Sequence, residues 1–264
     1  FNPHDAWLSV IAISGIAFVN YVCLKVFHGG GLYWSAVFGG LVNSSATVAE
    51  LGSRAESSGM TDRVSALCLL TTIAMFSRNL LLVALFSPPS LAATLWPLIV
   101  MCLVSGLWLW LDVHRQRKSK SAKVNQEVIK LDTPISLKKV LSFGLLFIVI
   151  QVGGILLTRA FGRFGMLATG FFGGLASSAS TTAAAASMAS HGQLGASVAG
   201  DVAILSSLAS AIINLPIIWR TVSDKAVVRR VTLELATIVL SGLMVIVLDQ
   251  TLSFSDHLLE LFKR

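Results

Sequence analysis

Apolar runs of about 20 residues recur along the whole chain, and they restrict its fold more than any other feature. Only 12% of the 264 residues are charged, about half the share of a soluble globular domain. Lipid cannot satisfy free backbone groups, and the runs lack the short alternation of an outer-membrane barrel, so we expect helices. The sequence predicts an all-α, multi-pass integral membrane protein. The expected segments are 7–27, 32–51, 64–86, 91–112, 140–159, 164–190, 196–219 and 231–249.

Positive charge is concentrated in one polar stretch between apolar runs. Eight of the 20 Lys and Arg residues lie between Arg115 and Lys139. This pattern is typical of a cytoplasmic loop, and it does not require nucleic acid to explain the net charge of +7. We therefore expect residues 113–139 on the cytoplasmic side of a cell inner membrane. The chain begins at Phe1 rather than at a methionine, which fits an excerpt from a longer polypeptide.

An internal repeat divides the chain. Residues 38–47 (FGGLVNSSAT) return as 172–181 (FGGLASSAST), and residues 70–80 match 205–215 at almost the same offset. A weaker match pairs Pro3 with Pro134 and Asn20 with Gln151. Because the matches keep their order, we predict two homologous halves of about four hydrophobic segments each, a common plan for transporters. The expected units are the first membrane repeat 1–112, the basic linker 113–133, the second membrane repeat 134–250 and a C-terminal tail 251–264.

The relative orientation of the halves depends on their Gly-rich segments. Four full crossings per half would make the repeats parallel, whereas three crossings and a broken or re-entrant Gly-Gly/Ser-rich segment would make them inverted. With a cytoplasmic linker, the inverted arrangement places more Lys and Arg side chains inside, so the charge distribution favours inversion.

The two Gly-Gly pairs, together with the hydroxyl-rich residues that follow each of them, are the main candidate for a binding site. Glycine weakens a helix, and a break at membrane depth is tolerated where protein or a watery cavity receives the freed backbone groups. Two broken segments would meet near the midplane and form a substrate site; the alternative is that small residues only allow close helix packing. The substrate-binding candidates are Gly39, Gly40, Asn43, Ser44, Ser45, Thr47, Arg78, Asn79, Gly173, Gly174, Ser177, Ser178, Ser180, Thr181, Asp201 and Asn214, with Thr182 beside them.

Arg78 lies inside an apolar segment, where an arginine is costly. It is expected to face a cavity, a substrate or a carboxylate, with Glu50 and Asp201 as candidate partners; the alternative is that it reaches the interface from the end of its helix. Glu234 is expected to pair with Arg229 or Arg230 at the cytoplasmic boundary. Asn79 and Asn214, like Asn20 and Gln151, suit hydrogen bonds across the bundle or to a solute.

Several kinds of chemistry are not supported. All five histidines lie outside the apolar runs or at their edges, so the many serines have no base beside them. No Cys/His cluster has zinc spacing, and no Walker lysine follows a glycine-rich loop. The cysteines Cys23, Cys68 and Cys102 each sit in an apolar run as packing groups. We therefore expect neither an enzyme nor a cofactor or metal site.

The repeated Gly-Gly-Leu-x-Ser/Asn-Ser motif, with Pro3 and the Arg78 segment, resembles the uncharacterised membrane domain fused behind MgtC/SapB-type membrane proteins. Asn43 stands where that pattern has a serine. The resemblance implies a bacterial inner-membrane protein associated with ion homeostasis, above all of magnesium, and it leaves the substrate open.

The residues favour a transporter or channel for a small ion or polar solute. Hydroxyls, freed N–H groups and an arginine favour an anion. Two alternatives remain: a pathway for magnesium or another divalent cation, which would prefer carboxylates, and a non-transporting regulatory subunit whose small-residue faces pack on another membrane protein. The expected partners are the lipid bilayer, the solute, and a second copy or an MgtC-type membrane protein; nucleic acid is not expected.

Overall fold

The computed structural model describes residues 31–118, 152–157 and 159–252, with isolated positions 11, 15, 145, 149 and 150. Most of segment 7–27, half of segment 140–159, most of the linker and most of the tail lie outside these residues. All regular structure in the described part of the chain is helical. The elements are α2 (Gly31–Ser57), η1 (Thr61–Arg63), α3 (Val64–Phe86), η2 (Pro88–Ser90), α4 (Leu91–Lys118), α6 (Arg163–Ser190), α7 (Ala196–Thr221) and α8 (Lys225–Leu252).

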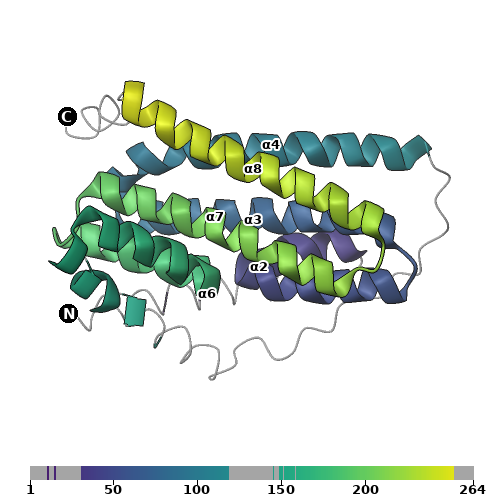
Figure 1. Ribbon diagram of the computed structural model, residues 1–264, viewed down its shortest axis with the longest axis horizontal. Coiled ribbons are helices and arrows are strands. Elements are labelled where there is room, and N and C mark those ends of the chain that lie inside the picture. Colours follow the sequence, from purple (N-terminus) through teal and green to yellow (C-terminus); the bar gives the residue numbers. More distant parts are fainter. Residues whose placement is uncertain are drawn as a thin grey trace.

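Four of the described helices are long and apolar enough to cross a membrane. These candidate spans are Thr61–Phe86, Pro88–Arg115, Ala196–Thr221 and Lys225–Asp249. They run along the long axis of the molecule (Figure 1). Large apolar side chains such as Leu103 and Leu240 are about two-thirds exposed on them, as expected of a lipid-facing surface. The predicted all-helical membrane protein is confirmed at this level.

Each of the two Gly-Gly segments contains one residue that leaves the helix. In α2 this residue is Asn43, with φ −153° and ψ 101°. In α6 it is Ser177, with φ −163° and ψ 107°. Both lie three residues after the second glycine of their pair. The break divides α2 into a first arm, 31–42, and a second arm, 44–57, and it divides α6 into arms 163–176 and 178–190.

At Asn43 the chain of α2 turns back on itself. A Cβ placed on Gly39 would lie 2.5 Å from Thr47 Oγ1, although residues eight apart in an unbroken helix are separated by about 12 Å along its axis. Ala36 of the first arm and Leu51 of the second belong to one buried apolar cluster. The two arms therefore lie side by side as a helical hairpin.

The chain of α6 folds back in the same way at Ser177. A Cβ placed on Gly173 would lie 2.7 Å from Thr181 Oγ1. Met166 of the first arm packs in one cluster with Ala185 and Met188 of the second arm. In Figure 1, α6 occupies one end of the long axis and α2 the other.

Each hairpin packs on the helix that follows it through the second glycine of its pair. A Cβ on Gly40 would lie 2.6 Å from the carbonyl oxygen of Thr71 in α3, and one on Gly174 would lie 2.6 Å from that of Ser206 in α7. At these two positions the small residue allows close helix packing, which is the alternative to a binding role. The glycine before each of them leaves room for the threonine of the second arm.

The helices α3 and α7 run in opposite directions. The start of α7 lies beside the start of α4, because a Cβ on Gly200 would meet Ala93 and the carbonyl oxygen of Ser90. The end of α7 lies beside the end of α2, where a Cβ on Gly52 would meet Thr221. The pair α2 and α3 and the pair α6 and α7 therefore point in opposite directions.

The helices α4 and α8 complete the bundle. Trp108 of α4 donates from Nε1 to Thr237 Oγ1 of α8 at 2.8 Å. Cys68 is buried and free, and Cys102 is free and half-buried; both contact the main apolar cluster. The expectation that these cysteines are packing groups is confirmed for the two that the structure describes.

Candidate functional site

The two chain reversals are capped by the same hydrogen bonds. Asn43 Oδ1 accepts from the backbone N–H of Ala46 at 3.1 Å, and Ser177 Oγ accepts from that of Ser180 at 3.2 Å. Both residues are therefore N-caps of the second arms, a position that Asn and Ser favour about equally. This equivalence explains why Asn43 can stand where the repeat has a serine.

A threonine closes each cap from within the second arm. Thr47 Oγ1 donates to the carbonyl oxygen of Asn43 at 2.8 Å, and Thr181 Oγ1 donates to that of Ser177 at 2.9 Å. The same two threonines contact the first arms, so each contributes to the hairpin rather than to an open cavity.

Arg78 lies between the tips of the two hairpins. Its side chain is buried, with 4% of the residue exposed. Nη1 donates to the carbonyl oxygens of Leu41 at 3.4 Å and Val42 at 3.1 Å, the last residues of the first arm of α2. Nη2 donates to Ser178 Oγ at 3.0 Å, at the start of the second arm of α6. One guanidinium thus joins the end of one helical arm to the beginning of another.

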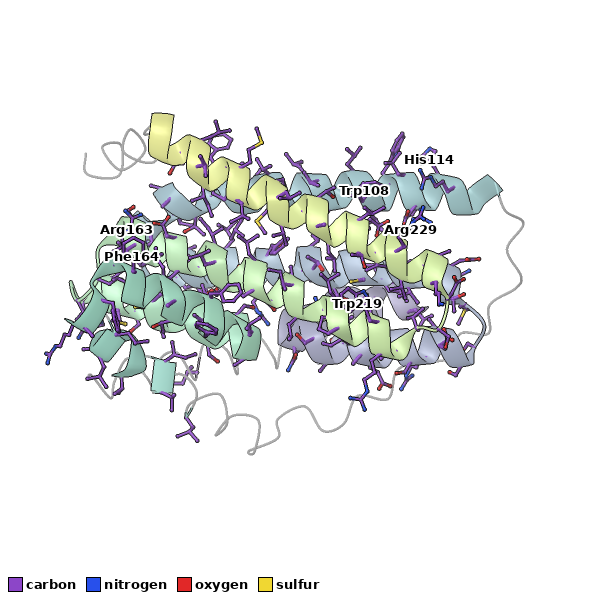
Figure 2. The ribbon with its side chains drawn as sticks, in the orientation of Figure 1. Trp108, His114, Arg163, Phe164, Trp219 and Arg229 are labelled. Carbon is purple, nitrogen blue, oxygen red and sulfur yellow. The ribbon has the colours of Figure 1, made fainter. Side chains whose placement is uncertain are left out.

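The predicted partners of Arg78 are wrong. Glu50 pairs with Arg54 at 2.5 Å, because residues four apart share a helix face. Asp201 pairs with Arg163 at 2.5 Å. Figure 2 shows Arg163 at the end of the molecule opposite to His114 and Arg229. No carboxylate among the described residues pairs with Arg78, and its burial excludes the alternative that it reaches an interface.

Asn79 connects the arginine to the opposite half. Its Oδ1 accepts from Nε and Nη2 of Arg78, each at 3.3 Å. Its Nδ2 donates to Ser207 Oγ of α7 at 2.9 Å. Both functions of the amide are therefore used, and Asn79 acts as a hydrogen-bonded link between α3 and α7.

The tip of the α2 hairpin contacts α7 directly. Ser44 Oγ lies 3.3 Å from Ser210 Oγ and donates to Met75 Sδ at 3.3 Å. Both serines are buried. Together these contacts form what we call the central polar cluster: Asn43, Ser44, Arg78, Asn79, Ser177, Ser178, Ser207 and Ser210.

Other predicted site residues lie beside this cluster or away from it. Ser180 Oγ donates to Ser177 Oγ at 3.0 Å within α6. Thr182 Oγ1 lies 3.0 Å from Ser206 Oγ, in the contact between α6 and α7. Ser45 is half-buried without a hydrogen bond from its side chain to the described residues. Asp201 is not part of the cluster. Asn214 is fully buried, and neither atom of its amide has a hydrogen-bond partner in the described structure.

Sequence reasoning missed the backbone carbonyls of residues 41 and 42, Met75, and the hydroxyls of Ser207 and Ser210. Carbonyl groups carry no signal in the sequence. The sequence carries a partial signal for Ser207, because its match in the repeat, Thr72, is also a hydroxyl residue, whereas Ser210 matches Met75 and has no such signal.

A second polar cluster, the charge cluster, lies near the start of α8. Arg230 Nε donates to Glu234 Oε1 at 3.2 Å, and its Nη2 contacts Asp112 Oδ1. Ser65 Oγ contacts one oxygen of each carboxylate. Asp112 and Glu234 are fully buried. The predicted pairing of Glu234 is confirmed with Arg230 as its partner, whereas Asp112 and Ser65 were not foreseen.

The fold and these two clusters define an all-helical protein with four candidate membrane-spanning helices, two helical hairpins and a buried arginine at their tips. The chain belongs to the family described as Domain of unknown function (DUF4010), which matches residues 11–221. The match agrees with the expected uncharacterised domain, but nothing in it links the chain to MgtC/SapB-type proteins. No curated protein and no solved structure matches the chain.

Proposed function

We propose that the protein is a membrane transporter or channel for a small ion or polar solute, in the first place an anion, which binds where the hairpin tips meet. The observation that carries this proposal is Arg78. It is buried between the tips, and all its hydrogen-bond acceptors are neutral. A buried cation without a counter-ion is unfavourable, so a negatively charged solute beside it would be stabilised.

The hairpin tips supply further donors for an anion. The first N–H groups of a helix have no partner within it, and the helix dipole makes that end positive. At each tip the N-cap satisfies only the third residue of the second arm, Ala46 or Ser180. The N–H groups of residues 44–45 and 178–179 therefore remain for a solute, as in other anion sites at helix N-termini.

The architecture favours a transporter built from inverted repeats. We propose that α2 and α6 are re-entrant hairpins that enter a cell inner membrane from opposite sides, with the basic linker in the cytoplasm. Their absence from the candidate spans and the opposite directions of α3 and α7 support this arrangement. Broken segments of both repeats that meet in the bundle are a common site for transported solutes.

A magnesium pathway is less well supported by the residues. Mg²⁺ prefers carboxylates and retained water molecules. Glu50 and Asp201 are each neutralised by an arginine outside the central polar cluster. The described residues contain no group of three or more His, Cys, Asp and Glu side chains that could hold a metal ion.

The function is tested by replacing Arg78 with glutamine. We expect flux of the transported anion into proteoliposomes to fall about tenfold or more, because a hydrogen bond from a charged donor contributes about 1.5–3 kcal/mol. Chloride, sulfate, phosphate and Mg²⁺ serve as the solutes. Arg54→Gln is the matched control, since Arg54 lies in α2, the hairpin that Arg78 contacts, but pairs with Glu50 away from the central polar cluster.

Two results would contradict the proposal. Equal anion flux for wild type and Arg78→Gln would separate Arg78 from permeation. Absence of flux for every solute, with folded wild-type protein, would favour the regulatory subunit.

The re-entrant hairpins predict which residues share a side of the membrane. Phe161 before α6 and Gln193 after it are both exposed. Cysteines at these two positions should react with an impermeant maleimide from the same side, and a cysteine at Ser58, after α2, from the other side. The background lacks Cys23, Cys68 and Cys102. Labelling of positions 161 and 193 from opposite sides would show that α6 crosses the membrane once.

A further inference from the structure

The two halves differ at the position of the buried arginine. Four oxygens accept hydrogen bonds from Arg78, and they come from Leu41, Val42, Asn79 and Ser178. In the repeat, the residues at the same positions, 134 or 135 residues away, are Leu175, Ala176, Asn214 and Ser44. The residue equivalent to Arg78 itself is Ile213. The positions related by the repeat thus offer the same four acceptors, three in the second half and Ser44 in the first, with an alkyl side chain in place of the cation.

The local geometry of the two halves supports this correspondence. The N-cap bonds of Asn43 and Ser177 match, and so do the contacts of Gly40 with Thr71 and of Gly174 with Ser206. The backbones that carry both sets of acceptors are therefore built alike.

Asn214 is the residue of the second set whose side chain lacks a partner. It is fully buried, and neither Oδ1 nor Nδ2 has a hydrogen bond within the described structure. Its counterpart Asn79 uses Oδ1 to accept from the guanidinium. A buried polar group without a partner costs about 1–3 kcal/mol and calls for an explanation. A cation beside Asn214 would satisfy Oδ1, which is the acceptor of the two atoms.

Ser44 contacts α7 one helical turn before Asn214. Ser44 Oγ lies 3.3 Å from Ser210 Oγ, and Ser210 precedes Asn214 by one helical turn on the same face of α7. The last carbonyls of the first arm of α6 have no partner within that arm, because the helix breaks at Ser177. These carbonyls form the negative end of the arm's dipole.

We propose that a monovalent cation, sodium, binds among the carbonyl oxygens of Leu175 and Ala176, Asn214 Oδ1 and Ser44 Oγ. It takes the place that the guanidinium of Arg78 has in the first half. Carbonyl and hydroxyl oxygens without a carboxylate suit a single positive charge, and carbonyls of half-helix ends hold coupling sodium ions in transporters. A divalent cation would require carboxylates, and none of the four groups supplies one.

The first test is the thermal stability of the purified full chain in sodium chloride and in choline chloride of equal ionic strength. A ligand that binds only the folded state raises the melting temperature, by about 5 °C or more at a hundred times its Kd. We expect a saturable rise in sodium chloride. Binding of radioactive sodium to the wild type, competed by unlabelled sodium, checks the same site directly. Equal melting temperatures in the two salts, with no bound sodium, would overturn the proposal.

Three variants assign the effect to this site. Asn214→Leu should lose the sodium response, whereas Asn214→Asp, which keeps the oxygen, should retain it. Ile213→Arg introduces the arginine that the first half has at this position. Its melting temperature in choline chloride should therefore equal that of the wild type in sodium chloride, and added sodium should not raise it further. Ser187→Ala is the matched control, because Ser187 Oγ is another buried atom without a partner in the described structure but lies ten residues beyond the tip. A full sodium response in Asn214→Leu would refute the assignment.

This inference does not depend on the anion proposal. Sodium binding without anion flux would leave the cation site standing and refute the transporter. Anion flux without any effect of sodium on stability or binding would leave the transporter standing and refute the cation site.

Discussion

Replacing Arg230 with leucine is expected to lower the free energy of unfolding by about 3–5 kcal/mol. Arg230 contacts both carboxylates of the charge cluster, and Asp112 and Glu234 are fully buried. Leucine keeps much of the side-chain volume but leaves two buried negative charges without their partner, and breaking a buried ion pair in this way costs about that much. The melting temperature of the purified protein should fall by about 10 °C.

Arg229→Leu is the control for this prediction. Arg229 lies one residue away on α8, and its side chain is exposed. Loss of an exposed charge usually changes stability by less than about 0.5 kcal/mol. Adding Asp112→Asn to Arg230→Leu removes one of the two stranded charges and should restore part of the loss. Equal melting temperatures of the two single variants would show that the charge cluster does not hold α4 and α8 together.

The sequence predicted most of the helices because their signal is local. The segments 64–86, 91–112, 196–219 and 231–249 are apolar over the length of a bilayer, and each lies in a helix of the structure. The interruptions of α2 and α6 also have a local cause. A Gly-Gly pair weakens the helix, and Asn43 and Ser177, three residues later, are residue types that begin a new one.

The contacts of Arg78 could not be predicted because their signal is not in the side chains. An arginine inside an apolar segment indicates a partner, and carboxylates are the partners that a sequence displays. The structure instead offers backbone carbonyls of residues 41 and 42, freed because the helix ends there. Any residue has a carbonyl, so only the geometry of the hairpin identifies these two.

The charge cluster illustrates a different limit. Glu234 and Arg230 lie four residues apart, so their pairing follows from helix periodicity. Asp112 and Ser65 come from two other helices and are more than 100 residues from Arg230. Their contact depends on how α3, α4 and α8 pack, which no local pattern specifies.

The close packing of α6 against α7 depends on Gly174, which has no side chain. The added methyl group of Gly174→Ala would lie 2.5 Å from Ser206 Cα and 2.6 Å from its carbonyl oxygen. Both atoms belong to the backbone of α7, so no side chain can rotate away and the two helices must separate. Separation would also displace Ser207 and Ser210, through which α7 reaches the central polar cluster.

We therefore expect Gly174→Ala to destabilise the protein by about 3 kcal/mol, at the upper end of overpacking effects, and to lower its melting temperature by about 8 °C. Gly40→Ala should behave alike, because its methyl group would meet the backbone of Thr71 at 2.6 Å. Gly106→Ala in α4 is the control: its methyl group meets nothing within 4 Å, so alanine should stabilise the helix by about 0.5–1 kcal/mol. A melting temperature of Gly174→Ala at or above that of Gly106→Ala would contradict the close approach of α6 and α7.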